Sequence, residues 1–537
     1  MRLLHRLIPI LAPVCLLLPV GAGAALPEDV IQTLAFGDSE EKIEAIGKAV
    51  AAGDASFLPL LQALSDGLVQ TADGKRVLIV EDGAATDVST GHAVNPIPAN
   101  PEDVVVNNRV RRELARAIAS LKLFSQEKAV RLEAAKELQS GADEGALPLI
   151  TKAVEKESDP EVRALLVLTQ AAIQLQSKDP SIRLSAVRAL AESNSANTRI
   201  LLLGLLEKKG ETFAEPDPGV RAEAQLSLRA VEARLSRGEL IGRVFSGISL
   251  GSILLLAALG LAITYGLMGV INMAHGELIM IGAYATYVVQ NGFRSYLPDA
   301  FDWYLIAALP MSFLAAALVG MALERSVIRF LYGRPLETLL ATWGISLILI
   351  QTVRSIFGAQ NVAVENPAWL SGGVQLLGNV VLPYNRIAII FFSAAVLLLV
   401  WLVLTRTRLG LFVRGVTQNR AMAGCVGVPT ARVDTYAFGL GSGIAGLAGC
   451  ALSQVGNVGP DLGQAYIVDS FMVVVLGGVG QLAGTVYAAL GLGVVNKFLE
   501  AWSGAVLAKI AVLVFIIVFI QKRPQGLFAL RGRAADA

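Results

Sequence analysis

The chain has 537 residues and a formal net charge of +1, which argues against a general binder of nucleic acid or another polyanion. Hydrophobic residues make up 54% of the sequence and its mean hydropathy is +0.59, which is too apolar for a soluble globular protein. The apolar excess is uneven, because residues 26–240 carry charges every few positions whereas residues 244–521 form mostly apolar runs. We therefore expect a polar domain followed by a membrane domain.

The N-terminus has the three parts of a secretory signal peptide. These are a charged start, an apolar core and a small-residue cleavage site: Arg2 with Arg6, Leu7–Val20, and Ala22–Ala24. The core holds three prolines and is shorter than the ~20 residues of a membrane span. We predict a signal peptide over residues 1–24, which would place residues 25–240 in the periplasm. An uncleaved membrane anchor is the alternative.

Residues 25–240 carry the pattern of short amphipathic helices. Three of these open with Asp-Pro, at Asp159, Asp179 and Asp217, and a related segment opens at Glu127 without it. Each Asp can cap a helix that has Pro at its first position. The spacing resembles HEAT-type α-repeats, so we predict a HEAT-like domain, with an ordinary helical bundle as the alternative.

The same half gives no sign of catalysis. A hairpin and a Pro-rich loop are expected between Thr71 and Pro101, and His92 is expected to lie in that loop. The whole chain has three cysteines and three histidines without metal-ligand spacing, and we find no nucleophile–base pair. We expect a binding or docking role and no catalytic, cofactor or metal site.

The membrane half contains nine apolar segments of spanning or nearly spanning length. They are 244–268, 273–290, 303–325, 336–354, 386–404, 433–453, 466–479, 481–498 and 504–521. The seventh and eighth are short, rich in glycine and joined by "LGGVGQLAGT", which indicates broken or re-entrant helices. The predicted fold class is therefore all-α, a polytopic helical membrane domain over 244–521 that follows the periplasmic helical domain.

Charge predicts the orientation of this domain. With the N-terminal domain outside, the inner loops are 325–334, 405–432 and 521–537, and they hold three, five and four positively charged residues. The outer loops hold Arg294 alone, apart from arginines at helix boundaries. The positive-inside rule thus agrees with the signal peptide and makes residues 522–537 a cytoplasmic tail.

One apolar run carries polar residues that require an explanation. "INMAHGEL" places His275 and Glu277 where a charged side chain costs roughly 2.5–3.5 kcal/mol at a bilayer centre. The two side chains lie about 200° apart on a helix, so they do not face one metal or catalytic site. We interpret Asn272, His275, Gly276 and Glu277 as a hinge near the cytosolic end of the first helical hairpin. Glu277 would cap the following helix or pair with an arginine of the 405–432 loop.

Small residues in several segments are spaced for close approach between helices. We predict tight packing at two groups of glycines: Gly439, Gly443, Gly446 and Gly449 in one segment, and Gly477, Gly478 and Gly480 in another.

The largest inner loop begins with basic residues, forms a short helical stretch and turns at Gly427 and Pro429. An amphipathic segment of this kind can be bound by a soluble partner. The loop resembles the coupling loop of the branched-chain amino acid/urea family of ABC importer permeases. The residues that match or flank its pattern are Arg414, Gln418, Asn419, Arg420, Ala421, Ala423, Gly427 and Arg432, with Val428 beside them. Where the general importer pattern has an acidic residue, this chain has Arg420.

Three further stretches strengthen the resemblance over residues 244–531. "ALGLAITYGLMGVINMAHGELIMIGAY" is similar to the family's first-helix signature, "VVVLGGVGQLAGTVYAALGLGVV" to its late glycine-rich signature, and "KRPQGLF" to its C-terminal ending. The resemblance implies a bacterial inner-membrane transport subunit that is not itself an enzyme. It also implies a second permease, two ATP-binding subunits that use the ATP, and a periplasmic solute-binding protein; lipid surrounds the spans and nucleic acid is not a partner.

The chain has no GxxxxGK[ST] phosphate-binding loop of its own. "IVDSFMVVVLGGVGQLAGT" and the secreted extension resemble the urea-type branch, which implies urea or a similar small amide as the solute. Branched-chain amino acid import is the alternative. A second, less favoured alternative is a passive urea or amide channel that carries a periplasmic scaffold domain.

Overall fold

The computed structural model describes residues 27–52, 55–72, 76–81, 84–94, 101–141, 144–210, 212–269, 272–377, 380–478 and 480–528. The chain divides into two compact units, Met1–Ala233 and Arg234–Ala537, and the boundary lies within one helix, α10 (Pro218–Met268). The predicted signal peptide and most of the predicted cytoplasmic tail lie outside the described residues.

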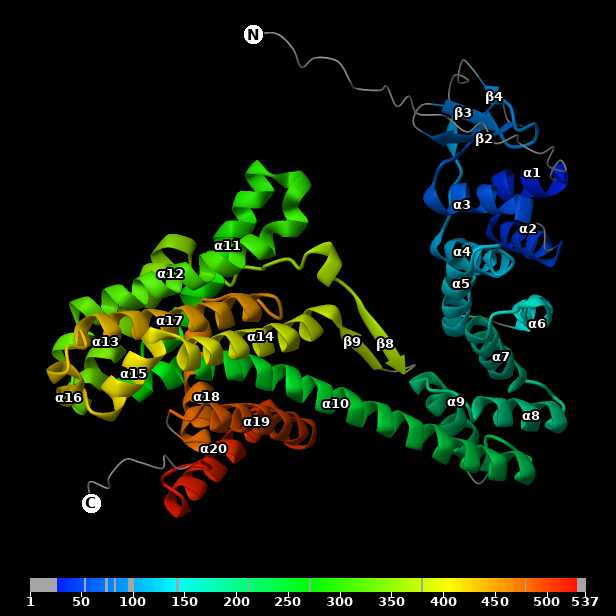
Figure 1. Ribbon diagram of the computed structural model, residues 1–537. Helices are drawn as coiled ribbons and strands as arrows, with labels where there is room; N and C mark the ends of the chain where they lie inside the picture. Colours follow the sequence, from blue (N-terminus) through cyan, green and yellow to red (C-terminus); the bar gives the residue numbers. More distant parts are fainter. Residues whose placement is uncertain are drawn as a thin grey trace, which may run out of the picture. The chain divides into compact units, whose positions relative to one another are not determined.

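The first unit combines helices with one sheet (Figure 1). Its helices are α1 (Glu28–Phe36), α2 (Ser39–Ala52), α3 (Leu58–Asp66), α4 (Asn108–Lys122), α5 (Lys128–Gly141), α6 (Leu147–Lys156), α7 (Pro160–Gln174), α8 (Pro180–Leu190) and α9 (Ala196–Leu206). Its strands are β1 (Val69–Ala72), β2 (Arg76–Glu81), β3 (Ala84–Asp87), β4 (Ala93–Val94), β5 (Glu102–Asp103), and the pair β6 (Lys208–Lys209) and β7 (Thr212–Phe213).

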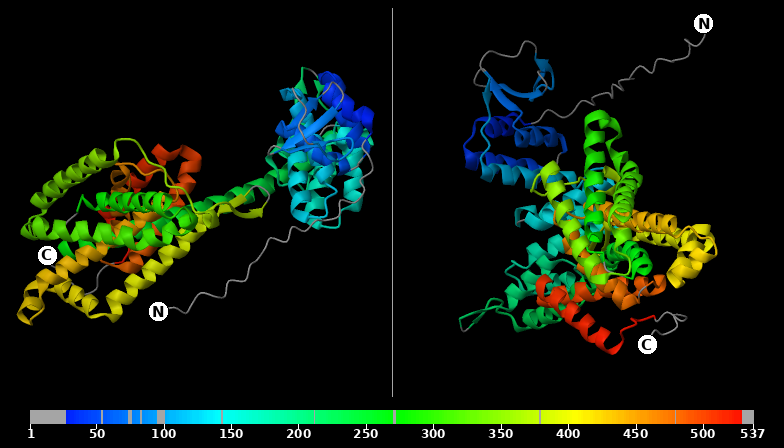
Figure 2. Two further views of the ribbon diagram at one scale, coloured as in Figure 1. Left: turned by 90° about the horizontal axis from the view of Figure 1, so that it is seen from above. Right: turned by 90° about the vertical axis from the view of Figure 1, so that its left-hand side faces the viewer.

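The predicted hairpin is part of a larger antiparallel sheet. Its strand order is β4-β3-β2-β1-β5, with Val69 of β1 opposite Ile79 of β2. The sheet lies beside α1–α3 (Figure 2), and Val69 and Val77 share a buried core with residues of α1 to α4. His92 lies in the exposed turn between β3 and β4, as expected from the sequence.

The Asp-Pro pairs begin helices as predicted. Asp159 caps α7 by accepting hydrogen bonds from the backbone N–H groups of Glu161 and Val162, and Asp179 caps α8 by accepting one from Ser181. Asp217 accepts from the N–H of Val220 in the first turn of α10. The HEAT-like assignment itself stays a prediction.

Two buried ion pairs repeat along this unit. Arg131 of α5 pairs with Glu157, two residues before the cap of α7, with an Nε–Oε2 distance of 2.8 Å. Arg183 of α8 pairs in the same way with Glu215, two residues before Asp217. Both arginines also donate to backbone carbonyls of the loop before their own helix. Equivalent contacts therefore join α5 to the loop before α7 and α8 to the loop before α10.

The second unit consists mainly of long apolar helices. After α10 these are α11 (His275–Tyr296), α12 (Tyr304–Ser326), α13 (Pro335–Phe357), α14 (Tyr384–Arg406), α15 (Arg408–Gln418), α16 (Arg420–Cys425), α17 (Thr430–Ser453), α18 (Leu462–Gly477), α19 (Leu482–Ser503) and α20 (Ala505–Lys522). One hairpin, β8 (Gly373–Leu377) with β9 (Val380–Pro383), precedes α14.

Seven of the described helices are long and apolar enough to cross a membrane, so the predicted polytopic all-α fold class is confirmed. They are Pro218–Gly266, Pro298–Phe330, α13, α14, α17, α19 and α20. Two of the nine predicted segments correspond to α11 and α18, which are not among the seven, and α18 has only 16 residues. The break between α18 and α19 falls at Gly478 and Gly480, which have φ of 97° and 77°.

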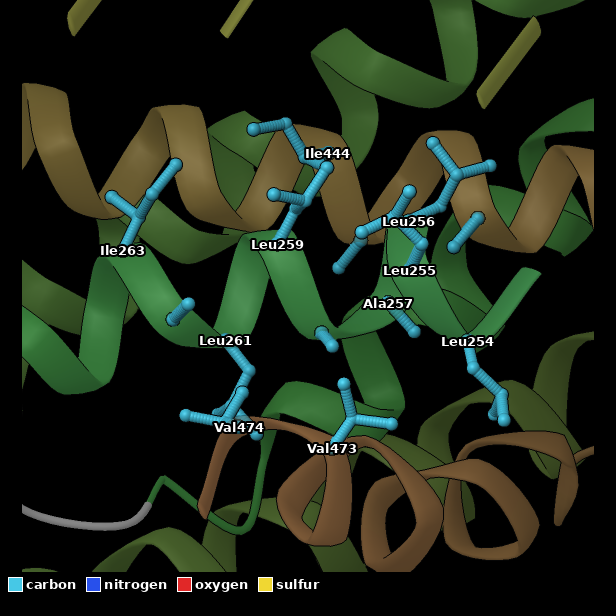
Figure 3. Close-up of a cluster of buried hydrophobic side chains, with 14 of the residues drawn as sticks. Leu254, Leu255, Leu256, Ala257, Leu259, Leu261, Ile263, Ile444, Val473 and Val474 are labelled. Carbon is cyan, nitrogen blue, oxygen red and sulfur yellow. The ribbon is translucent and has the colours of Figure 1, made fainter. Parts of the chain in front are cut away.

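The core of this unit surrounds α10 and α17. In their apolar stretches 72% and 83% of the residues are buried, against 17% in α20. Figure 3 shows α10 between two neighbours, with Leu259 toward Ile444 of α17 and Leu261 toward Val474 of α18. α11, α12 and α17 pack on one another, whereas α14 and α20 leave most of their apolar surface for lipid or another subunit (Figure 1).

Candidate functional site

The "INMAHGEL" stretch forms a break between α10 and α11. α10 ends at Met268, Gly269 adopts a φ of 68°, and α11 begins at His275. Asn272 is buried and its Oδ1 accepts a hydrogen bond from the N–H of Ala274, at 3.1 Å. The predicted hinge residues therefore lie at a true interruption of the helix, and Asn272 satisfies backbone there.

The partners of His275 and Glu277 differ from the prediction. His275 Nε2 lies 3.1 Å from the backbone oxygen of Ala257 in α10. Glu277 lies in the first turn of α11, and its Oε1 accepts a hydrogen bond of 2.8 Å from Ser346 Oγ of α13. The predicted pairing of Glu277 with a loop arginine is wrong, because its carboxylate is turned toward α13 and buried there.

The depth of the break also differs from the prediction. Ser346 is the middle residue of α13, which runs from Pro335 to Phe357. Ala257 lies about 16 Å along the axis from the end of α10, at 1.5 Å per residue. The break is thus level with the middle of α13 and with the middle of the apolar segment 244–268 of α10, rather than with the cytosolic end of a hairpin. The first residue of α11 therefore lies beside α10 well before the end of that helix.

The predicted packing glycines lie at helix contacts of two kinds. A Cβ on Gly446 would overlap the backbone oxygen of Ser312, and one on Gly449 would overlap that of Ile279, so these two permit close backbone approach. Gly439 and Gly443 instead face the side chains of Met321 and Phe313.

The second glycine group lies around the α18–α19 break. Gly477 packs against Gly484, and Gly478 against the backbone oxygen of Phe528. Gly480 has open space where a side chain would be, so its positive φ, rather than packing, requires glycine.

The predicted coupling residues form a helix–turn–helix that leads into α17. Arg414 and Gln418 belong to α15, and Asn419 caps α16 by accepting from the N–H of Met422 at 2.9 Å. Seven of the eight predicted residues are exposed: Arg414, Gln418, Asn419, Arg420, Ala421, Gly427 and Arg432. Ala423 is buried and anchors α16 in the core of the unit.

One ion pair connects α16 to α17. Arg420 bonds to Asp434, a residue of α17 with a fully buried side chain, and its guanidinium carbon lies 4.6 Å from the ring centre of Tyr332. Beside it, the buried Glu324 of α12 accepts a 2.7 Å hydrogen bond from Thr435. The exposed helix α16 is therefore fixed to α17 by an ion pair, and α17 is joined to α12 by a hydrogen bond next to it.

Asp434, Glu324 and Ser346 are not among the site residues predicted from the sequence. Asp434 and Glu324 lie within or next to predicted spans, and an ionisable residue in such a position is itself a signal of a specific partner. Ser346 gave no such signal, because serine is common in membrane helices.

The fold and these features define a polytopic helical membrane protein with an exposed helical loop on one end. Residues 243–521 match the family described as "Branched-chain amino acid transport system / permease component", and the chain belongs to this family of transport permeases. The first unit lies outside the matched residues.

Relatives of known description agree with this family. The high-affinity branched-chain amino acid transport system permease protein LivH of Salmonella typhimurium is 28% identical over 295 residues, which are 53% of this chain and 94% of the relative. BraD of Pseudomonas aeruginosa, with the same description, is 28% identical over 291 residues, 53% of this chain and 94% of its own. A probable LivH of Methanocaldococcus jannaschii is 24% identical over 51% of this chain and 88% of its own. No solved structure matches the chain.

Proposed function

We propose that this chain is one of two permease subunits of an ATP-driven importer that moves urea, or a similar small amide, into the cell. A periplasmic binding protein delivers the solute, and two ATP-binding subunits supply the driving force. Family membership supports the transport role. The observation that carries the ATP-driven mechanism is the exposed helix α16, which is linked to the core by Arg420 and Asp434.

The geometry of α16 suits a mechanical coupling. Most of the predicted contact residues in and around it are exposed, while Ala423 and Arg420 attach it to the bundle. A partner that moved α16 would therefore move the start of α17, which packs on α11 and α12. ATP-driven closure of the cytosolic subunits would switch the path between outward-open and inward-open states by this route.

Urea is the first candidate solute because of the resemblance of residues 467–485 and of the N-terminal extension to the urea-type branch. Urea is uncharged and offers four N–H donors and one carbonyl acceptor. Its path needs a few fixed polar groups rather than a line of charges. In this assignment the first unit is periplasmic and serves as a docking domain for the binding protein or the second permease.

Branched-chain amino acid import is the second candidate. It is favoured by the descriptions of LivH and BraD, which are branched-chain amino acid permeases. A passive urea channel is a third class, and it would need no α16 contact with an ATPase.

Uptake in reconstituted vesicles tests these candidates. We expect labelled urea to accumulate only with ATP, both ATP-binding subunits and the binding protein, and unlabelled leucine not to compete. Leucine uptake without urea uptake would identify leucine, rather than urea, as the solute. Urea uptake without the ATP-binding subunits would contradict the ATP-driven mechanism. Replacement of Gln418–Ala423 by a Gly/Ser stretch of equal length should abolish both uptake and co-purification of the ATPase.

A further inference from the structure

Three buried polar atoms at the start of α11 have no hydrogen-bond partner among the described residues. They are Asn272 Nδ2, His275 Nδ1 and Glu277 Oε2, and the three side chains are at most 1% exposed. Buried polar groups are normally satisfied, because each one left without a partner costs about 1–3 kcal/mol. Three such atoms within six residues indicate a missing partner with both acceptor and donor groups.

The carboxylate of Glu277 is unusual in a second way. Its Oε1 is occupied by Ser346, and no ion pair joins Glu277 to a cation in the described part of the chain. A carboxylate buried without a counter-charge is strongly unfavourable unless it receives several hydrogen bonds. The N-terminus of α11 supplies partial positive charge, but it leaves Oε2 available.

Two glycines let neighbouring helices pack directly against these groups. A Cβ on Gly463, in the first turn of α18, would lie 2.8 Å from Glu277 Oε2, and a Cβ on Gly260 would lie 3.0 Å from His275 Cε1. The break is thus enclosed by α10, α13 and α18, level with the middle of α13 and of the apolar segment 244–268 of α10. Discontinuous helices whose N-termini meet at the middle of a bundle are a common way to build a solute site in transporters.

We propose that Asn272 and Glu277 form the solute-recognition site of this permease, for a small solute that presents an N–H donor and a carbonyl or carboxylate oxygen. Glu277 Oε2 accepts the solute N–H, and Asn272 Nδ2 donates to the solute oxygen. His275 lies against α10, on another side of α11 from Glu277, and positions the start of that helix. This proposal rests on the proposed transport function and names the groups that contact the solute. Urea and a zwitterionic amino acid share this chemistry, and they differ in the charge on nitrogen.

The complete importer in vesicles provides the test, with labelled urea and labelled leucine as separate probes. We expect Glu277→Ala to lower uptake at least tenfold while the binding protein still stimulates ATP hydrolysis. Glu277→Gln keeps an oxygen that accepts N–H, so uptake of neutral urea should stay within threefold of the wild type. If leucine is the solute instead, its ammonium group needs the negative charge, and its uptake should fall at least tenfold in the same variant.

Thr286→Val is the matched control. Thr286 is a buried polar residue of the same helix, and its hydroxyl donates to the backbone oxygen of Gly282. We expect this variant to transport like the wild type. Uptake by Glu277→Ala within twofold of the wild type would overturn the recognition site. So would a result in which Glu277→Ala and Glu277→Gln both lose uptake, ATP hydrolysis and assembled complex to the same extent. A wild type that takes up neither solute would instead refute the transport proposal itself.

Discussion

Arg420 of the exposed helix α16 is paired with Asp434, whose side chain is buried inside α17. The two side chains differ in exposure: 42% of the Arg420 side chain is exposed, whereas only 1% of the Asp434 side chain is exposed. Water can therefore replace the partner of Arg420 but not that of Asp434. The pair joins the surface predicted to meet the ATPase with the helix at the centre of the bundle.

This asymmetry predicts unequal effects of the two single substitutions. Arg420→Gln leaves a buried carboxylate without its counter-charge, and removal of one partner from a buried pair costs about 3–5 kcal/mol, less here because Arg420 is half exposed. Asp434→Asn leaves an arginine that solvent can hydrate, so it should cost about 1 kcal/mol. Thermal inactivation of the purified permease in detergent should show the larger shift for Arg420→Gln. The double variant should recover part of the loss, and equal effects of the two single variants would contradict the asymmetry.

Close packing of α12 on α17 gives the second prediction. A methyl group on Gly446 would overlap the backbone oxygen of Ser312, so Gly446→Ala must separate the two helices. Overpacking of this kind costs typically about 1–3 kcal/mol. Gly491→Ala in α19 is the control, because nothing lies within 4 Å of its added methyl group. We expect a lower thermal midpoint for Gly446→Ala and an unchanged midpoint for Gly491→Ala, both measured on detergent-solubilised protein.

Much of the fold follows from local patterns in the sequence. Apolar length gives the long helices, and the Asp-Pro pairs at Asp159 and Asp179 give helix starts, because both signals act within one or two turns. The environment of Glu277 could not be predicted in this way. Its partner Ser346 lies 69 residues away, and only the packing of the start of α11 on the middle of α13 brings the two together.

The predicted sites show the same division. The exposed face of α16 could be predicted, because an amphipathic period and a basic loop mark it in the sequence. The attachment of that helix through Asp434 could not, since the aspartate lies in what reads as the first turn of an ordinary span. Glycines were predicted as packing sites, but whether each faces a backbone or a side chain depends on which helix lies opposite.

Acid should weaken the first unit at the ion pair between Arg131 and Glu157. The Arg131 guanidinium holds the pKa of Glu157 below its ordinary value, although burial of the carboxylate opposes this. A carboxylate whose pKa is lower in the folded state stabilises the fold above its unfolded pKa, and the stability is lost as the pH falls through the folded value. Hydrogen exchange of α5 and α7, corrected for intrinsic rates, should therefore accelerate below about pH 4. Glu157→Gln should accelerate it already at pH 7 and flatten the acid response, and an unchanged acid response in that variant would assign it to other groups.

The orientation of the membrane unit can be tested with the chain's own cysteines. Cys425 is exposed in α16, and Cys450 is buried in α17. In a Cys15→Ser background, Cys425 is the accessible thiol among the described residues, and the positive-inside rule places it on the cytosolic side. A membrane-impermeant maleimide should label inside-out vesicles and leave right-side-out vesicles unlabelled until detergent is added. Cys425→Ser should remove the signal in both. Labelling of intact right-side-out vesicles would show the opposite orientation, with α16 out of reach of a cytosolic ATPase.

Protection of Cys425 by bound ATP-binding subunits in inside-out vesicles would place the same helix in contact with them.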